Sequence, residues 1–290
     1  MDTVLLDEGL HRTTAPNGLV VYSESLPGVR SAAVGIYVRT ASAHERREQM
    51  GISHLLEHMV FKGTERRSAR DLALELEVRG GSLDAYTGRD ATSYQAHVLD
   101  ADLTLAVDIL TDLVRRPLLR ESDLEPERNV ILEEINGVAD TPDDLVFELH
   151  AAALWPDHPY GYSILGTPDT LAGISADDLR CLHQTGYHRG NCVVAAAGNL
   201  DHARLLEMLD REGWFEGRAR EPGSRPAQNN FRQWPPEPQN GDRNAKPRCP
   251  HTQVMAAPSC ACGRGCDFRT AAELSDCRSD SSPDGSSPQP

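Results

Sequence analysis

Residues 51–64 read GISHLLEHMVFKGT, and this stretch decides how the rest of the chain is interpreted. Its apolar residues recur at helical spacing: Ile52, Leu55, Leu56, Met59 and Val60. The spacing predicts a helix over Gly51–Phe61. His54 and His58 are four residues apart, so both imidazoles lie on one face of this helix, about one turn from each other.

Two imidazoles in this arrangement can reach a single metal ion. Zinc accepts neutral imidazole nitrogen, and its catalytic sites keep one position open for water. Glu57 follows His54 by three residues, and a carboxylate there can take a proton from water and hand it to a leaving amine. The string H-x-x-E-H is the inverted form of the H-E-x-x-H motif of zincins. The alternative is an ordinary solvated or packed helix that carries two histidines and a glutamate.

A metal site of this kind needs a third protein ligand, and a later acidic helix offers Glu127, Glu133 and Glu134. Glu134 shares an apolar stripe with Ile131 and Ile135, and a carboxylate there is costly unless it is paired or bound to metal. Glu134 is therefore the predicted ligand. Glu127 lies two turns earlier on the same stripe and is the candidate for orienting a ligating histidine. Its alternative role is that of an acid that stabilises the helix N-terminus.

The surrounding sequence alternates between strand and helix patterns. Runs at Leu19–Ser23 and Ala32–Arg39, on either side of Pro27-Gly28, predict antiparallel strands, and Leu83–Thr87 with Thr92–Leu99 predicts a hairpin. Ser68 is the expected N-cap of one helix. Further elements are expected in this order: helices over Ala69–Val78, Ala101–Arg115, Leu124–Val138, Asp143–Leu154 and Asp177–Tyr187, a buried strand over Asn191–Gly198, and a helix over Asp201–Arg211. The predicted class is α+β, with a mostly antiparallel sheet packed against helices.

The character of the sequence changes near residue 218. From 219 to 290, a third of the positions are Pro, Gly or Ser, and only four are Leu, Ile, Val or Phe. Such a segment cannot bury enough apolar surface to offset its ordering entropy. We therefore expect a folded domain over 1–218 and a disordered tail over 219–290. A zinc knuckle in that tail is the alternative, against which the absence of C-x-x-C spacing argues. Its ligands would come from Cys249, His251, Cys260, Cys262, Cys266 and Cys277.

Composition narrows the range of partners. The formal net charge is −15, which argues against nucleic acid because phosphate binding needs a basic face. The N-terminus resembles neither a signal peptide nor a mitochondrial presequence, and no apolar run approaches the roughly 20 residues that span a bilayer. A cytoplasmic protein without membrane contact is expected. Only Cys181 and Cys192 precede residue 249, so the front of the chain is not a disulfide scaffold.

Several blocks in order give a family resemblance. Residues 51–64, Glu127-Arg128-Asn129-Val130, Asp140–Asp144, His158-Pro159, Ile164–Thr167 and Ala197-Gly198-Asn199 resemble the M16 metallopeptidases. This family includes pitrilysin, insulysin and the mitochondrial processing peptidase, and the likeness is strongest to short bacterial members. The separation between His58 and Glu134 matches the separation between the second histidine and the third zinc ligand of that family. Both arguments therefore select Glu134.

The resemblance implies a zinc-dependent endopeptidase with one Zn²⁺ per chain, acting on extended peptides or unfolded protein segments. It also implies a substrate-binding edge strand at Asp84, Ala85, Tyr86 and Thr87, to which a peptide adds as a further strand. Without the resemblance these four residues are an ordinary hairpin arm. Tyr86 would either line the substrate cleft that the resemblance implies or fill the core.

Members of this family normally have two homologous halves, and the second half is not recognisable here. A truncation or a frame shift is one interpretation, and a homodimer or heterodimer that supplies the missing half is another. The rival functions are a non-catalytic subunit, an inert fragment that binds zinc, and small-molecule chemistry as in S-ribosylhomocysteine lyases. In those lyases cysteine is the third ligand, and no motif recommends Cys181 or Cys192 for that role.

Overall fold

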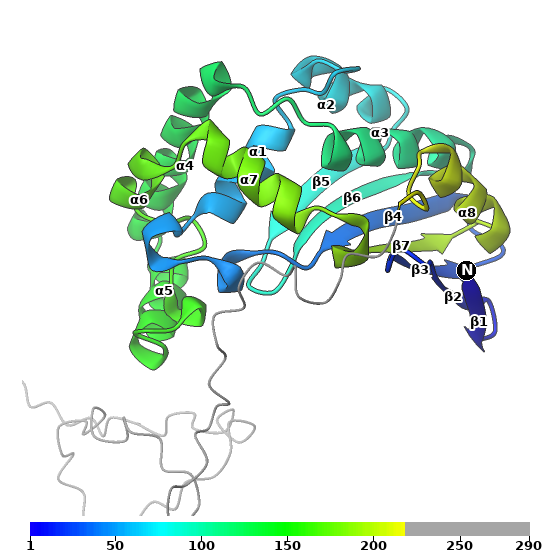
Figure 1. The fold of residues 1–290 in the computed structure, drawn as a ribbon, viewed down its shortest axis with the longest axis horizontal. Helices are drawn as coiled ribbons and strands as arrows, with labels where there is room; N and C mark the ends of the chain where they lie inside the picture. The colour runs from blue at the N-terminus through cyan, green and yellow to red at the C-terminus, as the bar shows by residue number, and fades with distance from the viewer. Residues whose placement is uncertain (218–290) are drawn as a thin grey trace, which may run out of the picture. The chain divides into compact units, whose positions relative to one another are not determined.

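The structure is a computed structural model that describes residues 1–217. A seven-stranded sheet runs through this part in the order β1-β2-β3-β7-β4-β6-β5, with helices packed on one face (Figure 1). The strands are β1 (Asp2–Asp7), β2 (Leu10–Thr14), β3 (Val20–Ser25), β4 (Ser31–Val38), β5 (Ser82–Thr87), β6 (Thr92–Leu99) and β7 (Cys192–Gly198). Only the β3–β7 pair is parallel, and the other five pairs are antiparallel. The α+β class with a mostly antiparallel sheet is confirmed.

The helices follow the predicted order, with small shifts in their ends. They are α1 (Ile52–Val60), α2 (Ala69–Glu77), α3 (Leu103–Arg115), α4 (Glu121–Asp140), α5 (Pro142–Leu154), α6 (Pro168–Gly173), α7 (Ala176–Gly186) and α8 (His202–Arg211). Ser68 caps α2 as expected, because its side chain accepts a hydrogen bond from the Asp71 N–H. None of the helices within residues 1–217 is both long enough and apolar enough to cross a membrane.

The two antiparallel strands predicted on either side of Pro27-Gly28 are present as β3 and β4, but they are not neighbours in the sheet. β3 and β4 do run in opposite directions, but β7 lies between them and bonds to both. Alternate residues of β7 are buried, which suits a strand in the middle of a sheet with one covered face. The strands β1 and β2 and the short helix α6 were not predicted. The sequence of β1, DTVLLD, lacks the alternating apolar pattern that marks a strand, and the strand is exposed along its whole length.

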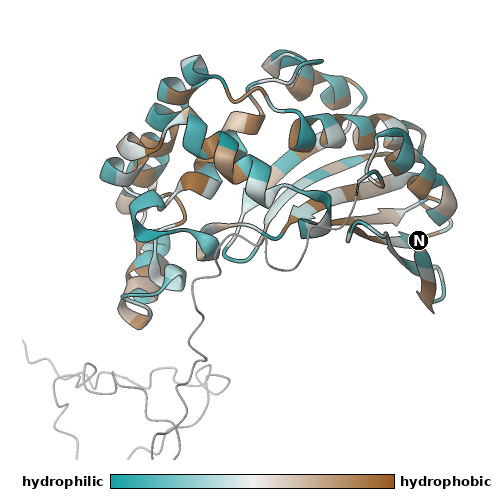
Figure 2. Cartoon of the chain, viewed as in Figure 1, coloured by the Kyte–Doolittle hydropathy of each residue, from teal (hydrophilic) through white to brown (hydrophobic). Residues whose placement is uncertain are grey.

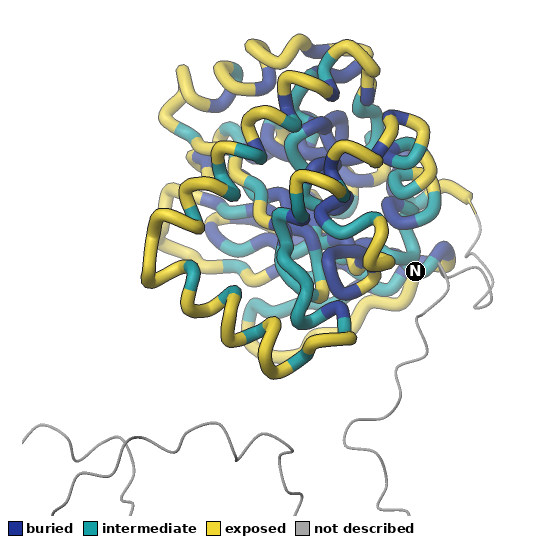
Figure 3. Tube along the Cα trace, turned by 90° about the vertical axis from the view of Figure 1, so that its left-hand side faces the viewer, coloured by how far each residue is buried: buried dark blue, intermediate teal, exposed yellow. Residues whose placement is uncertain are grey.

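The core lies between the sheet and the helices. Figure 2 shows apolar positions along the strands and the inner faces of the helices, and Figure 3 shows the buried positions gathered in the middle, with exposed positions on the outer turns. Within this core α1 buries Leu55, Leu56, Met59 and Val60 almost completely. The packing sets the rotation of α1 and turns the opposite face, with its two histidines, towards α4.

The end of the described chain is packed into the same core. Trp214 is fully buried, and its indole N–H donates to the Thr111 hydroxyl at 2.8 Å. The Asn17 side chain donates to the Trp214 carbonyl at 2.8 Å and so joins this end to the turn that precedes β3. The expected disordered tail over 219–290 and the candidate knuckle cysteines lie outside the described residues.

Candidate metal centre

Helices α1 and α4 lie side by side and bring three potential ligands together (Figure 1). His54 Nε2 lies 3.7 Å from Glu134 Oε2, and His58 Nε2 lies 3.6 Å from Glu134 Oε1. One potential ligand atom from each of the three residues lies within 4.8 Å of the others. Glu133, the neighbouring carboxylate on α4, is not part of this group. The helix face chosen from the sequence is therefore the face that meets the histidines.

The donor set fits a divalent metal ion. An ion held tetrahedrally at about 2.0–2.1 Å from each ligand would separate the ligand atoms by roughly 3.4 Å, close to the separations found here. Burial and the neighbouring His58 lower the pKa of His54 to about 4, so this imidazole is neutral near pH 7 and able to bind metal. The His54 Nδ1 atom is buried and has no hydrogen-bond partner within the described residues. The other ring nitrogen, Nε2, is the one that lies near Glu134.

Glu127 lies behind His58. Its Oε2 is 3.3 Å from His58 Nδ1, and its Oε1 is 2.6 Å from Lys62 Nζ. An ionised carboxylate only accepts hydrogen bonds, so Nδ1 is the donor in this contact, and Nε2 is the ring atom that faces Glu134. Because α4 begins at Glu121, Glu127 lies in its second turn and outside the first turn, where acids stabilise the helix dipole most. Its position matches that of a residue that orients a ligating histidine.

Glu57 faces strand β5. The Thr87 hydroxyl donates a hydrogen bond to Glu57 Oε2, and burial raises the pKa of Glu57 above its ordinary value. A carboxylate with a raised pKa holds a proton more readily near neutral pH, as a group that shuttles protons must. Sequence reasoning placed Thr87 only on the substrate strand and missed this contact, because the two residues are far apart in the chain.

Strand β5 is an edge of the sheet, since it pairs only with β6. Along it Asp84 is exposed, Ala85 is half-buried and Thr87 is buried. The Tyr86 side chain is 66% exposed, which rules out the alternative that it fills the core. The free edge of β5 therefore lies next to the helix that carries His54 and His58, and it is open for pairing with another strand.

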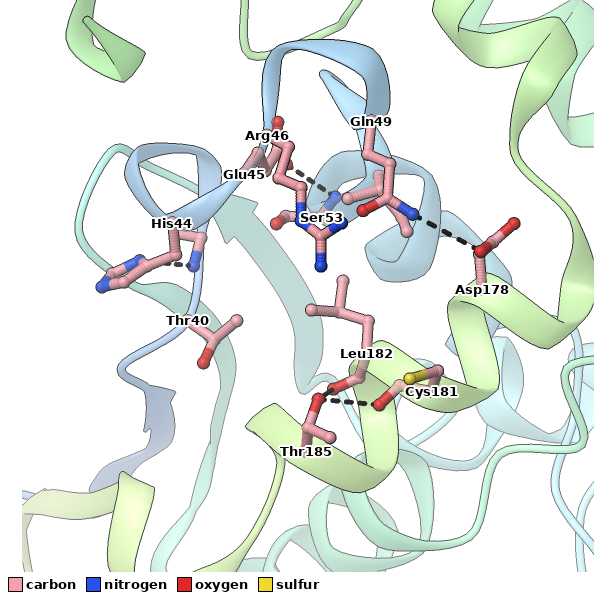
Figure 4. Close-up of a pocket in the computed structure, with 12 residues that line it drawn as sticks. Thr40, His44, Glu45, Arg46, Gln49, Ser53, Asp178, Cys181, Leu182 and Thr185 are labelled. Atoms are coloured by element: carbon pink, nitrogen blue, oxygen red, sulfur yellow. Dashed lines mark hydrogen bonds between the residues drawn. The ribbon is translucent and has the colours of Figure 1, made fainter. Parts of the chain in front are cut away.

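The N-terminal end of α1 is held by a residue that the sequence did not reveal. Glu45 is 4% exposed, and its two carboxylate oxygens accept hydrogen bonds from the N–H groups of Gly51 and Ser53, both at 2.8 Å. Figure 4 shows this region at the wall of a cavity of about 350 Å³ between α1 and α7. Gly51 has a φ of 92°, and a Cβ there would lie 2.7 Å from the Leu165 carbonyl oxygen. Only glycine fits at that point.

The two described cysteines lie apart from this cluster. Cys181 is exposed on α7 and Cys192 is buried in β7, and neither belongs to the group of potential ligands found within residues 1–217. The alternative with a cysteine ligand therefore has no support in this part of the chain.

Comparisons with known proteins identify the family of the chain. The model of "Insulinase (Peptidase family M16)" matches residues 20–168, and that of "Peptidase M16 inactive domain" matches residues 173–258. An uncharacterized zinc protease of Streptomyces coelicolor is 39% identical over 217 residues, which is 75% of this chain and 47% of the relative. One of Mycobacterium leprae is 42% identical over 201 residues, or 69% of this chain and 45% of the relative.

The crystal structure of pitrilysin superposes with a TM-score of 0.65 at 26% identity, over 73% of this chain and 24% of pitrilysin. This chain thus spans about half the length of the curated relatives that it matches.

Proposed function

The chain belongs to peptidase family M16, and from that premise we propose that it binds one Zn²⁺ ion and acts as a zinc-dependent endopeptidase on extended peptides or unfolded protein segments. One observation carries the proposal. His54, His58 and Glu134 converge at separations suited to a single ion, with the Glu57 carboxylate on the same helix as the histidines. The zinc protease names of the relatives support the choice of metal.

The proposed ligands are the Nε2 atoms of His54 and His58 and the carboxylate of Glu134. Bound zinc would supply Lewis acidity, which lowers the pKa of water and polarises a scissile carbonyl. Glu57 takes a proton from the attacking water and delivers it to the amine nitrogen that leaves. Thr87 holds one oxygen of Glu57, which leaves the other oxygen free for this transfer.

The substrate is proposed to bind along β5. A peptide laid against this free edge would form main-chain hydrogen bonds as an added strand. Thr87 belongs to β5 and also bonds to Glu57, so a peptide in this register passes close to the proton-transfer group. Tyr86 projects into solvent from the strand and would contact side chains of the substrate, as would Asp84 two residues earlier.

We also propose that a second M16-type half, from an identical or a different chain, packs against this one and completes the substrate site. Helix α5 buries none of its residues within the described part, and it exposes Val146, Phe147 and Leu149 by 55%, 71% and 62%. Large exposed apolar side chains that cluster on one helix favour contact with a partner. Cleavage per chain that rises with protein concentration, together with a dimer in sedimentation, would support this arrangement.

The test of the peptidase proposal compares wild type with Glu57→Gln. The glutamine keeps the shape of the side chain but cannot accept the proton, so we expect zinc content to stay the same and cleavage of an unfolded basic peptide to fall at least about 100-fold. Glu77→Gln is the matched control, because Glu77 is an exposed acid on α2. Equal cleavage by wild type and Glu57→Gln would remove the catalytic assignment. Normal zinc binding without any cleavage by wild type would favour the non-catalytic alternative.

A further inference from the structure

Glu127 is held from two sides by residues of the same segment. His58 and Lys62 are four residues apart, Lys62 lies two residues beyond the end of α1, and the Glu127 carboxylate reaches in from α4. One oxygen of Glu127 lies 3.3 Å from His58 Nδ1 and the other lies 2.6 Å from Lys62 Nζ. The carboxylate therefore bridges an imidazole and an ammonium group.

The Lys62 contact differs from an ordinary surface ion pair. The Glu127 side chain is only 8% exposed and that of Lys62 is 34% exposed, so water screens the pair less than it screens an exposed one. Other cations near this end of α4 have different acidic partners, since Arg120 pairs with Asp123 and Arg128 with Glu125. Within the described residues, Lys62 is therefore the Lys or Arg side chain that forms an ion pair with Glu127.

Lys62 is itself held in place. The Arg120 guanidinium donates to the Lys62 carbonyl oxygen at 2.7 Å, and the Leu118 N–H donates to the Gly63 carbonyl at 3.0 Å. The loop that follows α1 is thus bonded to the loop that precedes α4. An ammonium group on this loop can fix one carboxylate oxygen, and the position of the second oxygen beside His58 follows from it.

We propose that Lys62 is a positioning residue of the metal centre, which acts through Glu127 to hold the His58 imidazole in the orientation and tautomer that direct Nε2 at the ion. The inference rests on the proposed zinc site and adds a residue to it. Without the ammonium group, the Glu127 carboxylate is free to rotate, and His58 loses a fixed acceptor for its Nδ1–H. Outer partners of metal-ligating histidines contribute to metal affinity in this way.

Positioning by Lys62 and a simple charge effect predict opposite changes in zinc affinity when Lys62 is replaced. Lys62 is a cation near a site for a dication, so its charge alone repels the metal, and its removal would tighten zinc binding. Positioning predicts that removal weakens zinc binding. The sign of the change in the dissociation constant therefore separates the two accounts.

The experiment measures the zinc dissociation constant of the full chain by competition with a chromophoric chelator. We expect Lys62→Met to weaken zinc binding about fivefold, less than the roughly 10- to 100-fold typical of a direct partner of a ligating histidine. Lys62→Arg should restore most of the affinity, because it keeps the positive charge. Arg79→Met is the matched control, since it removes a cation whose partner is Asp102, outside the ligand cluster. Unchanged or tighter zinc binding by Lys62→Met would overturn the proposal.

A double-mutant cycle tests whether Lys62 acts through Glu127. In the Glu127→Gln background the further change Lys62→Met should have almost no effect on zinc affinity, because the group it positions is gone. An effect of the same size in both backgrounds would show that Lys62 acts by another route, and the proposal would be wrong.

A readout on metal-free protein keeps the inference separate from the proposed function. Long-range ¹H–¹⁵N spectra under mildly alkaline conditions report which nitrogen of His58 carries the proton. We expect the Nδ1–H tautomer in wild type and Lys62→Arg, and a mixture of tautomers in Lys62→Met. The same tautomer in all three proteins would refute positioning by Lys62. Absence of zinc binding by wild type would instead refute the proposed metal site and leave the tautomer result to decide the role of Lys62.

Discussion

Replacing Glu45 by glutamine should change how the stability of the protein depends on pH. Glu45 is almost fully buried at the first turn of α1, where its carboxylate accepts two backbone N–H groups. These hydrogen bonds favour the charged form, whereas removal from water favours the neutral form. Burial is the larger effect, and it raises the pKa of Glu45 from an ordinary 4.5 to about 7.

The size of the effect follows from these two pKa values. Because the pKa of Glu45 is higher in the folded protein, the folded state binds this proton more tightly than the unfolded chain does. The corresponding stability is fully present below about pH 4.5 and is lost as the pH rises through 7. The two values differ by about 2.5, and each tenfold change in proton affinity is worth about 1.4 kcal/mol, which gives about 3 kcal/mol.

The assay is urea unfolding of wild type and Glu45→Gln at a series of pH values between about 4 and 8, with a chelator present so that metal binding adds no pH dependence of its own. Glutamine does not titrate, so all other groups cancel in the difference between the two proteins. We expect the free energy of unfolding of wild type to fall by about 3 kcal/mol relative to Glu45→Gln across this range. A difference that stays flat would show that the hydrogen bonds cancel the effect of burial, and one that rises with pH would show that they outweigh it. Either result would refute the reasoning.

Three further predictions concern the metal centre and the start of the helix that carries its histidines. Glu134→Gln should lower bound zinc after dialysis far more than Glu133→Gln, because only Glu134 faces the histidines; the opposite order in metal analysis would overturn the choice of helix face. Thr87→Val removes the hydroxyl that bonds to Glu57 and should raise the pKa of the Glu57 carboxyl. The acid limb of the pH profile of kcat/KM should then move to higher pH, and an unshifted profile would contradict the contact. Gly51→Ala forces a Cβ to within 2.7 Å of a backbone oxygen at a positive φ and should cost at least about 1 kcal/mol of unfolding free energy; a neutral effect in urea unfolding would disprove the close approach.

Local patterns predicted the elements that carry the chemistry. The apolar spacing in 51–64 predicted α1, and the runs Leu83–Thr87 and Thr92–Leu99 predicted the β5–β6 hairpin, because both signals lie within a short stretch of chain. Glu134 was selected by its place on an apolar stripe, which is also a local property. Its role as a ligand stays a prediction, although the structure brings it to the two histidines.

What the sequence did not reveal depends on distant partners. β7 enters the sheet between β3 and β4 although most of the described chain separates β4 from β7, and no local pattern encodes that insertion. Glu45 lies in a polar segment where nothing marks a buried acid, and it lines the same cavity as residues of α7 that are distant in the sequence. The pairing of Lys62 with Glu127 likewise joins residues that are distant in the sequence.

The contacts at the two ends of α1 have a common physical reason. This helix has 9 residues, and an isolated helix of fewer than about 12 residues is marginal in water. It nevertheless carries both histidines and Glu57, whose relative positions must be held to within a fraction of an ångström for a metal site to work. Glu45 fixes the first turn, Lys62 and Glu127 fix the last, and Thr87 restrains the middle. Because these groups restrain one short rigid body, loss of any one allows motion that the others then oppose. The separate effects of replacing Glu45, Glu127 and Thr87 on zinc affinity should therefore add up to less than the effect of replacing all three together.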